Sequence, residues 1–105
     1  MLAAVKEGDV KKVAELMRQD PGFDVNVDQD GDGCTLLHFA CYDSKRSAVI
    51  PLLLAHRDID VNVKDMDEWT PFYWACGGRP FCILEMLKDS RVNVNEPDNA
   101  GEIQK

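Results

Sequence analysis

The residues with the clearest potential for metal chemistry are Cys34, His38 and Cys41. On a helix, their i, i+4, i+7 spacing places the three side chains on one face, and thiolates and imidazoles are the usual ligands of Zn2+. A closed zinc site needs a fourth ligand, and none is visible nearby in the sequence. Cysteine-based catalysis is also unsupported, because no cysteine and histidine pair comes with an orienting Asn or Asp in a recognisable order. We therefore predict neither a bound metal nor an enzyme.

A second pattern, Asp28-Gln-Asp-Gly-Asp-Gly33, matches the first half of a calcium-binding loop. Acidic residues occupy its first, third and fifth positions, and glycine occupies the sixth. Such a loop also needs a bidentate glutamate at the twelfth position, which is Phe39 in this chain. The coordination shell would stay half complete, so we predict no calcium site and no other cofactor.

The candidate residues lie in a chain that repeats itself. The segment Thr35-Leu-Leu-His-Phe-Ala-Cys41 aligns with Thr70-Pro-Phe-Tyr-Trp-Ala-Cys76 at an offset of 35 residues. A Val-Asn pair also recurs at Val25-Asn26, Val61-Asn62 and Val94-Asn95, each time before an acidic turn (30–33, 65–68 and 98–101). Self-similarity on this scale indicates structural units that stack on one another.

Each unit predicts a pair of helices. A short helix from Thr35 to about Tyr42 would begin at a threonine, which caps helix N-termini well. After a loop at 43–47, or 77–79 in the second unit, a longer helix would start near Pro51 or at Pro80, because proline is tolerated in the first helical turn. The expected buried face of the longer helices comprises Val49, Leu52, Leu53 and Ala55, then Ile83, Met86 and Leu87.

These motifs resemble the ankyrin repeat, whose pattern is roughly D-x-x-G-x-T-P-L-H-x-A-A, a loop, a helix with paired leucines and a return rich in Asp-Val-Asn. The matching residues of the first full unit are Asp30, Gly33, Thr35, Leu37, His38, Ala40, Leu53, Leu54, Asp60, Val61 and Asn62. Those of the second are Asp65, Thr70, Pro71, Phe72, Ala75, Leu87, Val94 and Asn95. Upstream, residues 3–10 with Val13, Leu16 and Met17 resemble an N-terminal capping repeat.

The resemblance implies an all-α solenoid of stacked helix-turn-helix units linked by β-hairpin-like turns. It would form one domain over residues 1–105, with an N-terminal cap at 1–29, repeats at 30–64 and 65–97, and a partial repeat at 98–105. In this family, the histidine at the position of His38 hydrogen-bonds neighbouring backbone and ties units together.

The chain departs from the family pattern at three positions and at its C-terminal end. Leu36 replaces the proline of the first helix, Tyr73 the histidine, and Glu68 the turn glycine. Glu68 would either strain its backbone or move to a different turn, since glycine there serves a positive φ. After Gly101 only four residues follow, so we expect an open C-terminal edge that exposes Phe81, Ile83 or Met86.

In the family, partners usually meet the turns and the exposed face of the first helices. By position this predicts partner-binding roles for Asp30, Asp32, Cys34, Tyr42, Asp43, Met66, Asp67, Trp69 and Trp74. Tryptophan, tyrosine and methionine are enriched at interface centres. The alternative is that Phe39 and Trp74 only pack between repeats while the acids stay solvated. Asn62 stands in a context similar to hydroxylated asparagines of the family, or else only hydrogen-bonds its own turn.

Composition narrows the partner class. The formal net charge is −7, with 19 acidic and 12 basic residues, which disfavours nucleic acid as a partner. No apolar run approaches a membrane span, and three of the four cysteines lie in apolar helix-like stretches, which is typical of reduced thiols in the cytoplasm or nucleus. We expect a non-catalytic module that binds another protein. The alternative is a fragment of a longer array whose open edge self-associates, as a homo-oligomer, or docks another domain.

Overall fold

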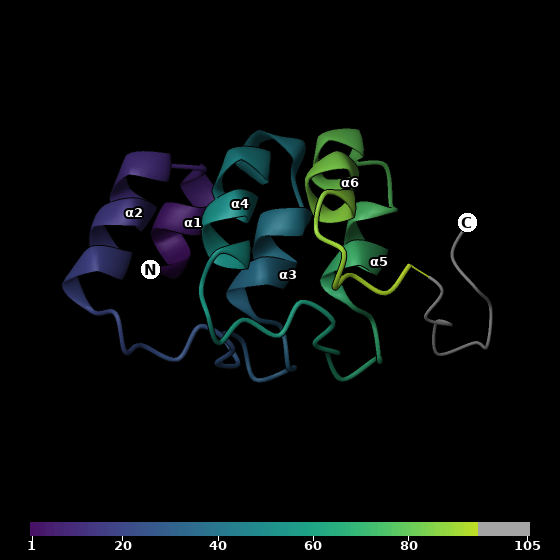
Figure 1. The fold of residues 1–105 in the computed structure, drawn as a ribbon. Helices are drawn as coiled ribbons and strands as arrows, with labels where there is room; N and C mark the ends of the chain where they lie inside the picture. The colour runs from purple at the N-terminus through teal and green to yellow at the C-terminus, as the bar shows by residue number, and fades with distance from the viewer. Residues whose placement is uncertain (95–105) are drawn as a thin grey trace.

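Seven helical segments follow one another along residues 1–94, the part of the chain that this computed structural model describes. They are α1 (Leu2–Glu7), α2 (Val10–Gln19), α3 (Leu36–Cys41), the 3-10 helix η1 (Ser44–Val49), α4 (Ile50–Leu54), α5 (Pro71–Ala75) and α6 (Pro80–Leu87). The helices stand side by side in successive pairs, and the connecting turns lie along the lower side of Figure 1. The described residues contain no strand, so the expected all-α stack of helix-turn-helix units is confirmed. The expected turn at 98–101 lies outside the described residues.

Local capping explains where the short helices begin. Thr35 and Thr70 both adopt extended backbone immediately before α3 and α5. The Thr70 hydroxyl accepts a hydrogen bond from the Tyr73 amide at 3.2 Å, which satisfies a backbone donor that has no partner within the helix. Pro80 is the first residue of α6, as the sequence predicts.

The longer helix of the first unit differs from the expectation. Residues 44–47 of the segment that we expect to form a loop (43–47) instead belong to η1, and the Asp43 carboxylate caps this helix by accepting from the Lys45 amide at 3.0 Å. The chain passes from η1 directly into α4, with Pro51 as the second residue of that helix. The prediction of a loop was wrong because the Asp43 cap supplies the start signal earlier than the proline does.

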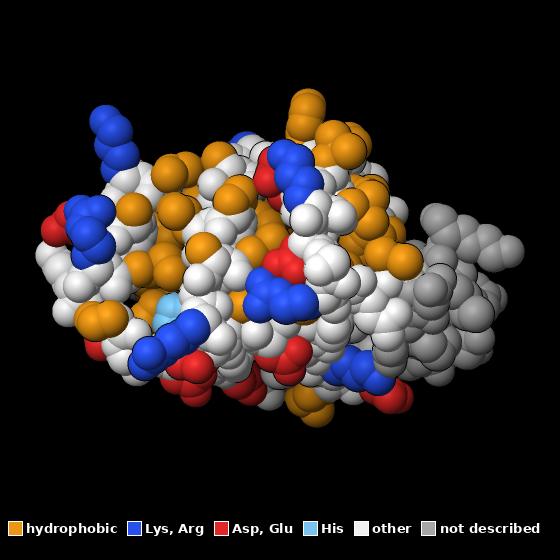
Figure 2. Space-filling model, in the orientation of Figure 1, with side chains coloured by type: hydrophobic (Ala, Val, Ile, Leu, Met, Phe, Trp, Pro, Cys, Tyr) orange, Lys and Arg blue, Asp and Glu red, His pale blue; other side chains and the backbone are white. Residues whose placement is uncertain are grey.

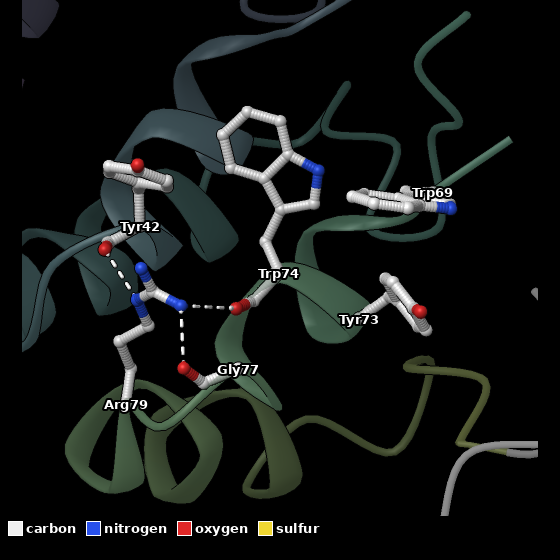
Figure 3. A pocket seen from close by; sticks show the side chains of 6 residues that line it. All are labelled: Tyr42, Trp69, Tyr73, Trp74, Gly77 and Arg79. Carbon is white, nitrogen blue, oxygen red and sulfur yellow. Dashed lines mark hydrogen bonds between the residues drawn. The ribbon is translucent and has the colours of Figure 1, made fainter. Parts of the chain in front are cut away.

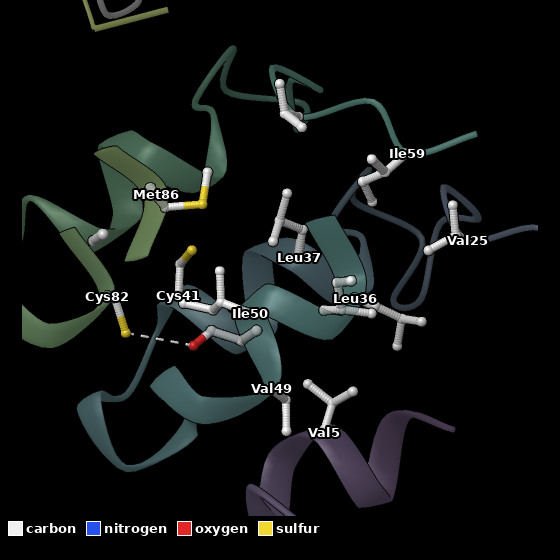
Figure 4. Packing of buried hydrophobic residues seen from close by; sticks show 14 of the residues in the cluster. Val5, Val25, Leu36, Leu37, Cys41, Val49, Ile50, Ile59, Cys82 and Met86 are labelled. Carbon is white, nitrogen blue, oxygen red and sulfur yellow. Dashed lines mark hydrogen bonds between the residues drawn. The ribbon is translucent and has the colours of Figure 1, made fainter. Parts of the chain in front are cut away.

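The buried interior runs continuously through the stack of helices. In Figure 4, Leu37 and Ile50 lie between Val5 of α1 and Met86 of α6. Of the predicted helix faces, Val49, Leu53 and Met86 are fully buried and Leu52 and Ile83 are half-buried, whereas Ala55 and Leu87 are exposed, contrary to expectation. The sequence interpretation missed Ile50 and Cys82, both fully buried.

Asparagine side chains join the return segments of neighbouring units. The Asn26 amide donates to the Asp58 carbonyl at 2.7 Å, and its oxygen accepts from the Asp60 amide at 2.8 Å. Asn62 repeats the arrangement one unit later, donating to the Arg91 carbonyl at 2.9 Å and accepting from the Asn93 amide at 2.8 Å. Asn62 therefore bonds the next segment of the stack, and the expectation that it serves only its own turn was wrong.

Two arginines connect the ends of the first helices. Arg46 donates to the carbonyls of Lys6 and Phe39, both at 2.9 Å. Arg79, which lies 33 residues later, donates to the Tyr42 carbonyl at 2.6 Å. Cationic donors at helix C-termini bond the carbonyls of the last turn and interact favourably with the helix dipole. The sequence interpretation missed both residues, although their spacing of about one repeat was a usable signal.

Candidate protein-interaction face

His38 connects the two units that carry the candidate interaction face. Its side chain is fully buried, its Nδ1 accepts from the Thr35 amide at 3.1 Å, and its Nε2 lies 2.8 Å from the carbonyl oxygen of Trp69 in the next unit. Because Nδ1 accepts, the proton sits on Nε2 and is donated to that carbonyl. Burial lowers the pKa of His38 and favours this neutral form. The expected role of His38 in tying units together is confirmed.

The structure does not place Cys34, His38 and Cys41 on one helical face. Helix α3 begins at Leu36, so Cys34 lies before the helix and does not share a helical face with His38 and Cys41. No group of three potential metal ligands occurs within residues 1–94. Both ring nitrogens of His38 are already engaged with backbone groups.

Asp65 is a buried carboxylate that organises the second turn. One oxygen accepts from the amides of Asp67 and Trp69, each at 2.9 Å, and the other accepts from Trp74 Nε1 at 3.0 Å. A carboxylate with several donors of this kind is well compensated for its loss of water. The bond to Trp74 connects the turn to helix α5. The sequence analysis matched Asp65 to the repeat pattern but did not predict it as a site residue, because its burial depends on tertiary contacts.

The two turns share one backbone shape despite different residues. Gly33 has φ of 83° and Glu68 has φ of 66°. Of the two expectations for Glu68, the strained backbone is therefore confirmed, since a side chain disfavours this left-handed region. At Gly33, a Cβ atom would also approach the Asp65 Cα to 3.1 Å. Glycine is needed there both for its backbone conformation and for the close packing of adjacent turns.

Trp74 packs against the preceding unit. Its ring meets His38 and Tyr42 edge-on, with centroids 5.2 and 5.5 Å apart. The packing role that we considered for Trp74 is present in the structure. The side chain is nevertheless only half-buried, and it stands between Tyr42 and Trp69 in Figure 3. One ring thus contributes both to repeat stacking and to the exposed face.

Two adjoining hollows lie on either side of these tryptophans. The aromatic hollow, of about 320 Å3, is lined by Tyr42, Trp69, Tyr73, Trp74, Gly77 and Arg79 (Figure 3). The acidic hollow, of about 420 Å3, is lined by Asp30, Asp32, Cys34, Asp65, Met66, Asp67, Trp69 and Trp74. Eight of the nine predicted site residues line one hollow or both. Asp43 lies apart from them, at the start of η1. The sequence interpretation missed Tyr73, Arg79 and Asp65.

Negative charge gathers at the turns. Acidic side chains appear along the lower edge of Figure 2, where the turns of Figure 1 lie. Asp30, Asp32 and Asp67 are exposed, and no ion pair within residues 1–94 involves them or Asp65. The Asp32 amide, which donates to Asp30, lowers the pKa of that carboxyl and keeps it ionised at neutral pH.

The outer side of α6 is apolar but differs from the expected open edge. Met86 is fully buried and Ile83 is half-buried, whereas Phe81 is 61% and Leu87 is 51% exposed. The exposure of Phe81 agrees with our expectation, whereas the burial of Met86 contradicts it.

Stacked helix pairs that contact mainly their sequence neighbours define a solenoid repeat protein. A family model of ankyrin repeats (3 copies) matches residues 1–98, and the chain belongs to the ankyrin-repeat family. Members of this family generally mediate protein–protein interactions.

Similar segments occur in proteins of several kinds. The chain is 44% identical over 57 residues to the SMC5-SMC6 complex localization factor protein 1 of Bos taurus, covering 53% of this chain and 5% of that protein. It is 29% identical to the palmitoyltransferase AKR1 of Kluyveromyces lactis, covering 94% and 13% respectively. It is 31% identical to the human transient receptor potential cation channel subfamily A member 1, covering 83% and 8%. The chain thus spans only a small part of each. Within residues 1–94, no helix has the length and apolar character that crossing a bilayer demands.

Proposed function

We propose that this chain binds a protein partner through the face that carries the aromatic and acidic hollows, and that it performs no catalysis itself. The observation that carries the proposal is the adjoining pair of hollows that share Trp69 and Trp74 as a common wall. His38 bonds the backbone carbonyl of Trp69 and Asp65 bonds the Trp74 indole, so both residues of this wall are anchored by hydrogen bonds. A preorganised wall reduces the entropy that binding would otherwise cost.

The exposed side chains around this wall are of the kinds that anchor interfaces. Met66 is 71% exposed and Tyr42 is 53% exposed, although both are large and apolar. Together with Trp69 they can bury a large area at a modest loss of rotamer entropy. The exposed acids Asp30, Asp32 and Asp67 surround this apolar centre and favour a partner with basic or mixed charge.

The chemistry of the reactive side chains supports a binding role over catalysis. Burial, with smaller contributions from Asp30, raises the pKa of the Cys34 thiol to about 12. Burial likewise raises the pKa of the Cys82 thiol to about 11. Thiols of this kind are mostly protonated at neutral pH and are weak nucleophiles. All four cysteines are free, which fits a reducing compartment such as the cytoplasm or nucleus.

The test compares affinity purifications from one cell lysate with the wild-type chain, Trp69→Ala and Phe81→Ala. Phe81 is the matched control, because it is an exposed aromatic residue on α6 outside both hollows. A partner retained by wild type and Phe81→Ala but lost from Trp69→Ala supports the proposal, provided that all three proteins melt alike. Identical partner sets for all three proteins would refute the assignment of this face. Retention should also weaken between about 50 and 300 mM salt, because salt screens the acidic rim.

A second candidate role uses the end of the stack. Ile50 is fully buried beneath α6, whereas its counterpart Ile83 is only half-buried, and Leu54 is half-buried whereas its counterpart Leu87 is exposed. We propose that Ile83 and Leu87 stack against a further helical unit, another domain or a second copy. Light scattering over a range of concentrations separates these cases, because only self-association gives a mass that rises with concentration and returns to monomer in Leu87→Glu.

A further inference from the structure

We infer that the partner segment inserts a basic side chain, with arginine preferred over lysine, into the acidic hollow while a bulky apolar residue beside it fills the aromatic hollow. This inference rests on the proposed function and specifies the chemistry of the partner. It depends on the fact that carboxylates and indole rings enclose the same space. Neither kind of group alone would favour a cation as strongly.

The carboxylates of the acidic hollow differ in their availability. Asp65 is fully engaged by amides of its own turn and by the Trp74 indole. The side chains of Asp32 and Asp67 accept no hydrogen bond from the described residues, and both are exposed. Their charge is therefore available to a donor from outside, and carboxylates bind a guanidinium through paired hydrogen bonds.

The walls of the hollow favour the same ligand. Trp69 and Trp74 both line it, and the negative face of an indole ring attracts a cation. A guanidinium is planar and weakly hydrated, so it can stack on an indole while its edge meets a carboxylate. An ammonium group would make the charge contact but would stack less well, which is the reason for the preference for arginine.

Two cations of the chain itself already lie over aromatic rings in α3 or directly after it. The Arg79 guanidinium lies 4.7 Å from the Tyr42 ring centroid, and the Lys6 ammonium lies 5.2 Å from that of Phe39. Trp74 occupies the position equivalent to Phe39 in the next unit, at the offset of 35. A basic residue of the partner would continue this series of cation–ring contacts at the acidic hollow.

The aromatic hollow adjoins the acidic one and differs in character. Tyr42, Trp69, Tyr73 and Trp74 supply rings, and none of the described residues that line it is acidic. Such a space suits a phenylalanine, leucine or similar side chain. Because Trp69 and Trp74 border both hollows, a single short segment can fill both with residues close together in its sequence.

The test uses short synthetic peptides of glycine and serine that carry one arginine and one phenylalanine at every relative spacing. We expect at least one spacing to bind the full chain. In that peptide, replacing arginine by the uncharged isostere citrulline should weaken binding about 10- to 100-fold, and lysine should lie between the two. Replacing phenylalanine by alanine should weaken binding about 10-fold.

Variants of the chain locate the contact. Asp32→Asn with Asp67→Asn should abolish the difference between arginine and citrulline peptides. The matched control, Glu7→Gln with Asp20→Asn, makes the same change in net charge at exposed positions outside the hollow and should behave as wild type.

The outcomes separate this inference from the proposed function. Equal binding of citrulline and arginine peptides, loss of discrimination in the control pair, or no bound peptide at any spacing would each overturn the inference. If Trp69→Ala loses its lysate partner while citrulline substitution has no effect, the proposed function stands and the inference falls. If neither Trp69→Ala nor the Asp pair weakens any binding, both fall.

Discussion

Replacing His38 by alanine removes a fully buried ring that joins two repeats. The change leaves the Thr35 amide and the Trp69 carbonyl without their hydrogen-bond partner, and each unsatisfied buried group costs about 1–3 kcal/mol. The Trp69 carbonyl is only partly buried and can recover a water molecule, so we expect a total loss of about 2–4 kcal/mol. A chain of 105 residues has an unfolding free energy of about 5–15 kcal/mol, so this is a large fraction.

Urea unfolding at two pH values measures this contribution. Burial lowers the pKa of His38 in the folded state below the value of 6.5 for an unperturbed histidine. The unfolded chain then binds a proton more readily, so this contribution is fully present above pH 6.5 and is lost as the pH falls from 6.5 through the folded pKa. The wild-type protein should lose up to about 1.4 kcal/mol per pH unit in that window through this group, and His38→Ala should not.

The chain offers a matched control in its only other histidine, His56, which is half-buried. Among the described residues, its ring accepts a hydrogen bond from the Asp58 amide of its own segment at 3.1 Å and meets Phe23 edge-on. His56→Ala should retain the part of the pH dependence that His38 causes. The reasoning would be refuted if His38→Ala lost less than about 1 kcal/mol. If the unfolding free energy of His38→Ala changed between the two pH values as much as that of the wild-type protein, the assigned protonation state would be refuted.

Three further predictions concern the turns, the asparagine bonds and the thiols. Glu68→Gly should raise the unfolding free energy by about 0.5–1 kcal/mol in thermal melts, because relief of the left-handed backbone exceeds the added chain entropy; a lower melting temperature would contradict this. Asn62→Ala should lose about 1–3 kcal/mol in urea, because two hydrogen bonds to the next segment disappear, and Asn26→Ala should lose a similar amount. The Cys34 thiol, with a pKa of about 12, should react slowly with Ellman's reagent at pH 8 until denaturant is added, and rapid reaction of the native protein would count against its burial.

The sequence alone was sufficient to predict the repeat architecture and most of the residues that line the candidate face. Thr35, Thr70 and Pro80 mark helix starts through interactions within one turn, so their effect does not depend on distant residues. Regular spacing of the same motif then determined which residues share a position in successive units. Because stacking repeats each position, the sequence could predict that Tyr42, Trp69 and their neighbours belong to one face.

Only the tertiary structure decided which atoms meet across units. Asp65 and Asp67 are both acids of one turn, yet Asp65 is buried because the Trp74 indole and two amides surround it, whereas Asp67 faces solvent. Arg46 and Arg79 likewise find carbonyls of preceding helices that lie far away in sequence. These contacts depend on the offset and rotation between stacked units, and those are determined by side-chain packing over the whole interface. Local sequence signals carry no information on that geometry.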